Sequence, residues 1–219
     1  MKKEVVLTSD GSSSIYLPDW DESYHSKHGA IQEAKHVFIE SGFQKCNKNL
    51  LYILEIGFGT GLNAFLTLNE AILHNKEVFY TGIEAYPVST DMICALNYPN
   101  IIEGGKLESY FKKMHESPWE KLLDVHTFFK LTKRNQFFQT IEDVDTFDLI
   151  YFDAFGFRVQ PELWSETIFQ KMYNALKKDG ILVTYACRTP IRKAMEAVGF
   201  TTEKLPGPPG KREMLRAFK

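Results

Sequence analysis

The sequence predicts an α/β fold, in which a largely parallel sheet is flanked by helices and preceded by a small N-terminal annex. Short apolar runs alternate with segments of helical periodicity from residue 50 onward. A glycine-rich turn joins the first of these runs to a helix, and acidic residues stand at the ends of two later runs. With 219 residues, 44% of them hydrophobic, the composition is that of one globular domain, or of one domain with an annex.

Residues 4–24 hold short apolar pieces interrupted by polar turn residues, which predicts a small hairpin. Residues 29–41 predict a helix, because apolar residues recur on one helical face: Ile31, Ala34, Val37 and Phe38. Gly42 is expected to end this helix. We therefore divide the chain into an annex, residues 1–45, and a main domain, residues 46–219.

The centre of the main domain is predicted to be a β-α-β unit. Leu50–Ile56 is a continuous apolar run closed by glycines, which is typical of a strand buried on both faces of a parallel sheet. Residues 62–75 have helical periodicity, and residues 78–83 form the next apolar run. Since such crossovers are right-handed, the second strand should lie parallel to the first.

The middle of the chain, residues 99–147, has mixed periodicity and predicts a helix near 106–115 and a strand near 125–131. Residues 148–153 form a third apolar run, which predicts a strand ending in Asp153.

The remaining third continues the alternation. A helix is predicted from Leu163 onward, and Lys177–Gly180 would supply its cationic last turn and glycine stop. Residues 181–185 predict a strand. The last helix is predicted to take Thr189 as its N-cap and Pro190 as its first residue, and to run to Gly199.

Charge and cysteine content exclude several classes of protein. Lys+Arg 26 against Asp+Glu 28 gives a net charge of −2, so the chain as a whole has no attraction for nucleic acid or anionic lipid. No uncharged apolar run reaches the about 18 residues of a membrane span. The cysteines, Cys46, Cys94 and Cys187, and the six histidines have no metal-ligand spacing, so we expect no metal and a reducing, cytoplasmic compartment.

Basic residues gather toward the C-terminus: Arg188, Arg192, Lys193, Lys204, Lys211, Arg212, Arg216 and Lys219. On charge alone, this segment fits a solvated charged tail as well as it fits a contact with phosphate.

The strongest motif is the segment Glu55–Asn63, which stands where the first buried strand turns into a helix. Its three glycines, Gly57, Gly59 and Gly61, let the backbone come close to a ligand, and the helix N-terminus directs N–H groups toward it. This arrangement indicates a nucleotide-type cofactor loop.

The identity of the cofactor follows from two positions. Dinucleotide-binding loops need a third glycine where Leu62 stands, which disfavours a dehydrogenase. Glu55 at the strand end fits S-adenosylmethionine-dependent methyltransferases, because the cationic sulfonium tolerates an acid there, whereas a pyrophosphate would be repelled.

Two further acids stand at strand ends. Glu84 lies roughly 20 residues beyond the glycine loop, where a carboxylate accepts hydrogen bonds from the hydroxyls of a cofactor ribose. Asp153 should open toward the crevice at the carboxyl ends of the strands, where ligands bind in open α/β sheets.

These residues resemble a known family, the methyltransferase half of the bifunctional enzyme that makes 5-methylaminomethyl-2-thiouridine at the wobble position of tRNA. The segments that carry the resemblance are Trp20–Tyr24 with Gly29 and Glu33, Glu55–Asn63, Glu84–Pro87, Asp153–Phe155 with Pro161 and Trp164, Gly199-Phe200, and Lys211–Met214. The resemblance implies a Rossmann-like class I S-adenosylmethionine-dependent methyltransferase fold.

The resemblance also implies an activity, a substrate and a set of site residues. A methyl group would pass from S-adenosylmethionine to the primary amine of 5-aminomethyluridine, with or without 2-thiolation, at position 34 in the anticodon loop of tRNA. Asp153 is the candidate catalytic residue. The candidate cofactor residues are Glu55, Gly57, Phe58, Gly59, Thr60, Gly61, Asn63, Glu84 and Ala85. The candidate substrate residues are Tyr24 and Phe155, for stacking on the base, and Lys211 and Arg212, for phosphates.

The sequence departs from the family at three points. The flavin-dependent oxidoreductase domain of the larger members has no counterpart, so the resemblance is to a stand-alone methylating form, and we expect a separate enzyme to supply the aminomethyl or carboxymethylaminomethyl-processed uridine. Lys133-Arg134-Asn135 stands where the family shows an acid beside the adenine, and Glu142 or a backbone group is the candidate substitute. Gly156-Phe157 replaces the usual Ala-Pro after the aspartate motif.

Alternative functions within the same fold remain. A small-molecule amine methyltransferase or an aminopropyl transferase also pairs an amine acceptor with a strand-end aspartate. The Asp153–Arg158 stretch has fewer acids than a polyamine pocket usually has. A non-catalytic binding module of this fold is a further alternative.

Overall fold

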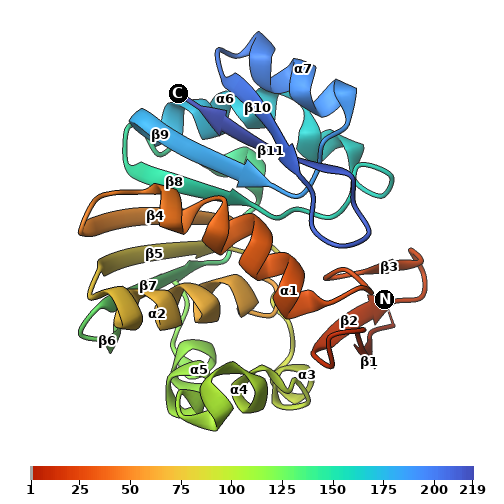
Figure 1. Ribbon diagram of the computed structural model, residues 1–219, viewed down its shortest axis with the longest axis vertical. Coiled ribbons are helices and arrows are strands. Elements are labelled where there is room, and N and C mark those ends of the chain that lie inside the picture. The colour runs from red at the N-terminus through yellow and green to blue at the C-terminus, as the bar shows by residue number, and fades with distance from the viewer. Residues whose placement is uncertain (1) are drawn as a thin grey trace.

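The computed structural model describes residues 2–219 and contains an eight-stranded mixed sheet with helices on both faces (Figure 1). The strand order is β10-β11-β9-β8-β4-β5-β7-β6. These strands are β4 (Leu50–Ile56), β5 (Glu77–Ile83), β6 (Leu122–His126), β7 (Phe129–Arg134), β8 (Phe147–Phe152), β9 (Leu176–Thr184), β10 (Thr201–Pro206) and β11 (Glu213–Phe218). The α/β class predicted from the sequence is confirmed.

The central strand is β4, which pairs in parallel with β5 on one side and with β8 on the other. Helix α2 (Leu62–His74) connects β4 to β5, as the sequence predicted for residues 50–83. β7 continues the parallel order beyond β5, and β9 continues it beyond β8. The carboxyl ends of these five strands therefore point the same way and form one edge of the sheet.

The two faces of the sheet have separate apolar cores. On one face lie α2, α5 (Glu108–Glu116) and the long N-terminal helix, which begins as α1 (Ala30–Ala34) and continues as a π-helix over Lys35–Glu40. On the other face lie α6 (Glu166–Ala175) and α7 (Thr189–Ala197). The short helices α3 (Thr90–Cys94) and α4 (Tyr98–Ile101) precede α5.

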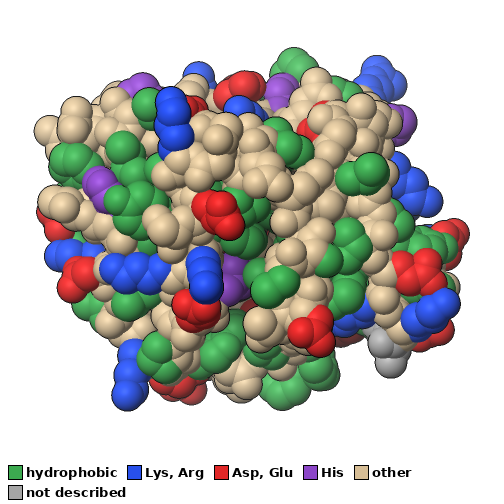
Figure 2. Space-filling view, turned by 90° about the horizontal axis from the view of Figure 1, so that it is seen from below, with side chains coloured by type: hydrophobic (Ala, Val, Ile, Leu, Met, Phe, Trp, Pro, Cys, Tyr) green, Lys and Arg blue, Asp and Glu red, His purple; other side chains and the backbone are tan. Residues whose placement is uncertain are grey.

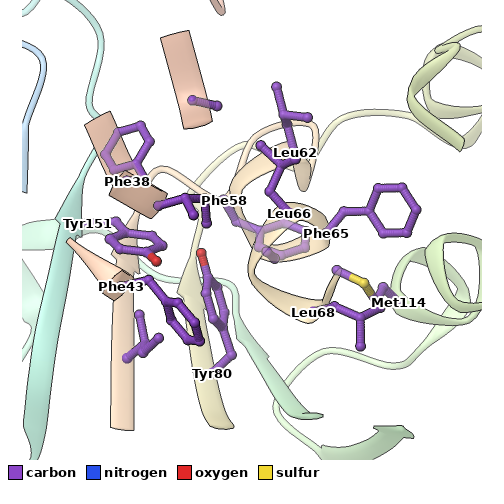
Figure 3. Packing of buried hydrophobic residues seen from close by; sticks show 14 of the residues in the cluster. Phe38, Phe43, Phe58, Leu62, Phe65, Leu66, Leu68, Tyr80, Met114 and Tyr151 are labelled. Atoms are coloured by element: carbon purple, nitrogen blue, oxygen red, sulfur yellow. The ribbon is translucent and has the colours of Figure 1, made fainter. Parts of the chain in front are cut away.

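The first of these cores is rich in aromatic rings contributed by different elements (Figure 3). Phe38 of the N-terminal helix lies with its ring centroid 5.1 Å from that of Tyr151 of β8, and Phe65 of α2 lies 5.0 Å from Phe111 of α5. Because Phe38 and Tyr151 are both buried, the N-terminal helix is held directly against the sheet.

The annex is a three-stranded antiparallel sheet of β1 (Glu4–Leu7), β2 (Ser13–Leu17) and β3 (Glu22–Ser23). The sequence predicted the hairpin but not its short third strand. In Figure 1 the annex lies beside the loop between β10 and β11, and the His36 ring nitrogen Nε2 lies 2.9 Å from the Pro206 carbonyl oxygen. The first and last parts of the chain therefore meet.

Three predicted elements differ in the structure. The strand near 125–131 is an antiparallel hairpin of β6 and β7, with a turn at residues 127–128. The helix α7 takes Arg188 as its N-cap, so Thr189 and Pro190 lie within its first turn.

The third difference is the end of α6, which stops at Ala175 instead of continuing into Lys177–Gly180. That stretch is an irregular part of β9, where the register against β8 shifts. Contacts with the C-terminal end of the chain explain why the helix stops. The Asp179 amide donates to the Lys219 carbonyl and the Lys219 amide donates to the Gly180 carbonyl, so this backbone pairs with the end of the chain.

We predict that Gly82→Ala destabilises the protein by about 1–3 kcal/mol, because a Cβ at this position would lie 2.3 Å from the buried ring of Phe58. Gly156→Ala is the matched control, since its Cβ would have no neighbour closer than 3.6 Å. Urea unfolding of both variants measures the difference. Equal stability of the two would contradict the tight packing of Phe58 on Gly82.

Candidate active site

A cavity of about 1120 Å³ opens at the carboxyl ends of the parallel strands. Its walls come from the annex, the glycine loop after β4, the ends of β5 and β8, and the loop between β10 and β11. Of the fourteen residues that the sequence marked as candidates, all but Gly61 and Arg212 line this cavity. The topology thus brings nearly all of the predicted site into one place.

The glycine loop is shaped by its close approach to β8. Gly57 has φ 89°, and a Cβ there would lie 2.6 Å from the Asp153 carbonyl oxygen. The amides of Gly57 and Phe58 both donate to the carbonyl of Ile83, at 3.0 and 2.9 Å. The loop is therefore fastened to the ends of both neighbouring strands, and only glycine fits at its start.

The side chain of Phe58 does not line a surface for base stacking. Its ring is buried against Gly82 and lies within 6.3 Å of the rings of His115 and Trp119. The loop reaches the cavity here mainly through its backbone, because the Phe58 ring is buried. Gly61 also packs against the interior, because a Cβ there would lie 2.9 Å from the ring of His115.

Glu84 stands directly after β5 and is oriented by two backbone donors. Its carboxylate accepts the amide of Gly59 at 3.0 Å and the amide of Tyr86 at 2.9 Å. Two backbone hydrogen bonds hold the carboxylate at the cavity wall, and its remaining lone pairs are available to hydroxyl donors. Ala85 follows it on the same wall.

Asn63, in the first turn of α2, links the two other acids of the site. Its amide nitrogen donates to Glu55 Oε1 and to Asp153 Oδ2, at 2.8 Å each. The sequence predicted that Asn63 contacts the cofactor, but not that it would lie between two carboxyl groups. The Asn63 side chain thereby fixes the positions of both acids at the floor of the cavity.

Both acids bind protons more readily than usual. Burial raises the pKa of Glu55 well above its usual range, and the hydrogen bond from Asn63 offsets this only in part. Burial also raises the pKa of Asp153 to about 7, and the nearby Glu33 carboxylate adds to the effect, whereas Asn63 and Lys211 oppose it. Asp153 can therefore exchange a proton near neutral pH.

Thr60 is tied to the annex through His25, a residue that the sequence analysis did not select. The His25 Nε2 atom lies 3.4 Å from the Thr60 hydroxyl, and Nδ1 lies 3.1 Å from the Ser14 hydroxyl of β2. Burial lowers the pKa of His25 to about 4, so the ring is neutral at pH 7. Its position between hydroxyl groups of the annex and of the loop could not be read from its place in the sequence.

The segment Lys133-Arg134-Asn135, which replaces an expected acid, is turned away from the cavity or used in packing. Lys133 donates to the His115 carbonyl at the end of α5, and Arg134 pairs with Asp143 at 2.8 Å. Asn135 donates to the carbonyls of Glu84 and Ala85. The exposed Glu142 does not line the cavity either.

The cavity wall near the end of β7 is supplied by the residues that follow: Phe137, Phe138 and Gln139. The exposed ring of Phe137 lies edge-on to that of Tyr86, with centroids 5.9 Å apart. Phe137 and Phe138 make this part of the wall aromatic, and none of the three residues is acidic.

The annex side of the cavity is also aromatic. The ring of Phe155 is in edge contact with Tyr24, at 5.0 Å between centroids, and with Trp20, at 5.5 Å. Tyr185, which follows β9, donates its hydroxyl hydrogen to the Ala154 carbonyl at 2.8 Å. Tyr24 and Phe155 thus lie together on one wall, as their assignment to substrate contact requires. Tyr185 was missed, although its place just after a strand was a usable signal.

The C-terminal bases are mostly engaged in ion pairs within the fold. Five of them pair with carboxylates: Arg192 with Glu196, Lys204 with Glu213, Lys211 with Glu33, Arg216 with Glu203, and Lys219 with Asp145. On the face drawn in Figure 2, positive and negative side chains are interspersed. Among residues 2–219 no ion pair is found for Arg188, Lys193 or Arg212, and all three are exposed.

Within residues 2–219, no helix is long and apolar enough to cross a bilayer. The same residues contain no group of three or more His, Cys, Asp and Glu side chains placed to hold a metal ion.

The chain is similar to several known proteins. Residues 112–219 match the family model described as S-adenosyl-L-methionine-dependent methyltransferase. Over 96% of its length the chain is 31% identical to the tRNA 5-methylaminomethyl-2-thiouridine biosynthesis bifunctional protein MnmC of Leptospira interrogans, and 27% identical to that of Cupriavidus metallidurans. It spans about a third of the length of these relatives, 34% and 33%.

The fold is also shared with solved structures. MNMC2 from Aquifex aeolicus superimposes with a TM-score of 0.80 at 21% identity, over 99% of this chain and 69% of that one. Spermidine synthase from Thermotoga maritima superimposes with a TM-score of 0.56 at 16% identity, over 100% and 72%. At these identities the two structures establish the Rossmann-like fold.

The residues present fit S-adenosylmethionine, the cofactor of the matched family. The glycine loop leaves room that a Cβ would fill, since a Cβ on Gly59 would lie 3.2 Å from the Tyr24 ring. Two buried acceptor atoms on the cavity floor, Glu55 Oε2 and Asn63 Oδ1, have no hydrogen-bond partner within residues 2–219. Unpartnered acceptors beside acids suit a ligand that carries an ammonium and a sulfonium group.

We predict that Asp153→Asn stabilises the protein above neutral pH. The raised pKa of Asp153 means that the folded state holds this proton more tightly than the unfolded state, so wild-type stability falls as pH rises from about 4 to about 7. The variant lacks this loss and should be more stable by up to about 4 kcal/mol at pH 8, because about three pKa units at 1.36 kcal/mol each separate the folded and unfolded values, with little difference at pH 4. Urea unfolding at both pH values checks this. Equal stability of the variant and the wild-type protein at pH 8 would contradict a raised pKa of Asp153.

Proposed function

We propose that this chain, which matches the S-adenosylmethionine-dependent methyltransferase family over residues 112–219, methylates the primary amine of 5-aminomethyluridine, with or without 2-thiolation, at position 34 of tRNA. The observation that carries the proposal is Asp153, a partly buried carboxyl with a pKa of about 7 that lies between a cofactor loop and an aromatic wall. The similarity to the MnmC proteins supports the substrate.

S-adenosylmethionine, when bound, supplies an electrophilic methyl group on its sulfonium. The backbone of Gly57–Gly61 would approach the cofactor, and Glu84 would accept hydrogen bonds from its ribose hydroxyls. Glu55 and Asn63 would contact its amino acid part. Ala85, Phe138 and Gln139 contact the adenine, in place of the missing acid.

Asp153 prepares the acceptor amine. An aminomethyl group enters mostly as an ammonium, and its nitrogen lone pair is blocked until a proton leaves. The Asp153 carboxylate takes that proton, and the bond from Asn63 holds the carboxyl group in place. The remaining contribution of the protein is to hold nitrogen and carbon at reacting distance.

The aromatic wall explains how an RNA base is bound by a protein of net charge −2. A base of the anticodon loop is unpaired and can be splayed into a pocket, where it stacks on aromatic rings. Tyr24 and Phe155 supply this surface at the entrance to Asp153. Arg212, exposed and near the cavity, contacts a phosphate, and Lys211 faces the bound nucleotide.

The amine must be generated by another reaction, one that installs or uncovers an aminomethyl group on the uridine. We propose that a separate enzyme supplies it and that both act in the cytoplasm, where tRNA is modified.

The test is transfer of labelled methyl from S-adenosylmethionine to tRNA that bears 5-aminomethyluridine, with unmodified tRNA and spermidine as competing acceptors. We expect label only on the aminomethylated tRNA, and a loss of at least about 100-fold with Asp153→Asn, because proton removal then lacks its base. Asp145→Asn is the control, since this acid does not line the cavity and pairs with Lys219.

Other results lead to the alternatives. Label on spermidine in preference to tRNA would indicate a small-molecule amine methyltransferase. Transfer of an aminopropyl group from decarboxylated S-adenosylmethionine to an amine would indicate the aminopropyl transferase. Binding of tRNA without any transfer would indicate a non-catalytic module.

We predict that Glu84→Gln weakens binding of S-adenosylmethionine by about 10- to 100-fold, because the variant loses a charged acceptor for the ribose hydroxyls. Glu77→Gln is the control, since Glu77 stands at the opposite end of β5 and pairs with Lys130. Isothermal titration calorimetry measures both. Equal affinities would show that Glu84 serves only to hold the loop.

A further inference from the structure

The cavity holds an ion pair to which the proton transfer described above assigns no part. Lys211, in the loop between β10 and β11, pairs with Glu33 of α1. Both residues line the cavity, and their side chains are 33% and 10% exposed. The Lys211 ammonium also lies 4.1 Å from the centroid of the Tyr185 ring. A cation is therefore held within the site by a carboxylate and an aromatic face.

Both ends of this pair are fixed in position. The Glu33 carboxylate also accepts a hydrogen bond from the Ser26 amide at 2.8 Å, which anchors it to the segment that follows β3. Tyr185 is anchored to the carbonyl of Ala154, the residue after Asp153. The ring beneath Lys211 is thus hydrogen-bonded to the backbone of the residue that follows Asp153.

The other groups around Asp153 have different roles. Asn63 of α2 donates to it, and Glu55 of β4 shares that donor. Tyr80 of β5 and Tyr185 are buried phenols whose pKa values are raised by burial, so both are neutral. His25 is neutral at pH 7, and Glu84 is occupied by backbone amides. Lys211 is the cation that acts on Asp153, and Glu33 is the nearby anion that opposes it.

We propose that Lys211 and Glu33 are positioning residues for the acceptor step, whose opposite charges set the balance at Asp153: Lys211 favours the ionised carboxylate that takes the proton, and Glu33 limits this by its own negative charge. This inference rests on the proposed function. The acceptor ammonium loses one proton, the N–H electron pair stays on nitrogen, and an O–H bond forms on Asp153. Lys211 keeps its own protons throughout.

The direct test is a ¹³C NMR titration of the Asp153 carboxyl in aspartate-labelled protein, with the signal assigned from Asp153→Asn. Removing the cation in Lys211→Met should move the titration midpoint to higher pH. Removing the anion in Glu33→Gln should move it to lower pH. Lys211→Arg should leave it near the wild-type value, because the charge is kept.

The double variant Lys211→Met with Glu33→Gln separates charge from structure. If the two groups act on Asp153 by charge, the opposite shifts cancel and the midpoint returns toward wild type. Lys204→Met is the matched control, since Lys204 lies on β10, pairs with Glu213 and does not line the cavity. Shifts of the same sign in both single variants, or no shift in either, would overturn the proposal.

The kinetic test uses the pH dependence of kcat/KM for the aminomethylated tRNA. Lys211→Met should lose roughly threefold or more at pH 6 and little at pH 9, because only the acid limb follows Asp153. A loss that is equal at every pH, with an unchanged Asp153 titration, would identify Lys211 as a phosphate contact and overturn the proposal. The NMR titration needs no turnover, so it still decides the inference if no methyl transfer is found.

Discussion

The side-chain amide of Asn63, shared between Glu55 and Asp153, is the contact on which the rest of the site depends. It exists because β4 and β8 are parallel neighbours in a register that pairs Glu55 with Tyr151 and Ile56 with Phe152. That register places one acid at the end of β4 and the other just beyond β8. The first turn of α2 then lies above both. Without the amide donor, two carboxyl groups would face each other in a buried place with no compensating hydrogen bond.

Close backbone packing transmits this arrangement to the cofactor loop. Gly57 lies against the carbonyl of Asp153, so the loop and the proposed base cannot shift independently. The loop is also bonded to Ile83, and Glu84 bonds back to Gly59. Three strand ends are thereby held as one rigid unit. Such preorganisation suits a reaction in which the protein mainly positions two reactants and accepts a proton.

The acceptor side is built differently, from the two ends of the chain. The annex supplies Tyr24, His25 and the anchor for Glu33, and the loop between β10 and β11 supplies Lys211. The annex and the loop between β10 and β11 lie outside the central strands of the sheet. The residues proposed to bind the cofactor instead follow the central strands β4 and β5. The proposed cofactor site therefore lies on the core of the fold and the proposed substrate wall on its periphery.

Local patterns in the chain are enough to predict the elements whose neighbours are local: the apolar run Leu50–Ile56, the helix α2 after the glycine loop, and the strand-end acids Glu84 and Asp153. These follow from periodicity, glycine spacing and the handedness of β-α-β units, which act within a few dozen residues. Contacts between distant parts of the chain follow from how the elements pack against one another. Gly180 pairs with Lys219, His25 meets Thr60, and Lys211 reaches Glu33 across most of the sequence. A charge pattern shows that Lys211 is basic, but its burial and its partner depend on which distant surface folds against it.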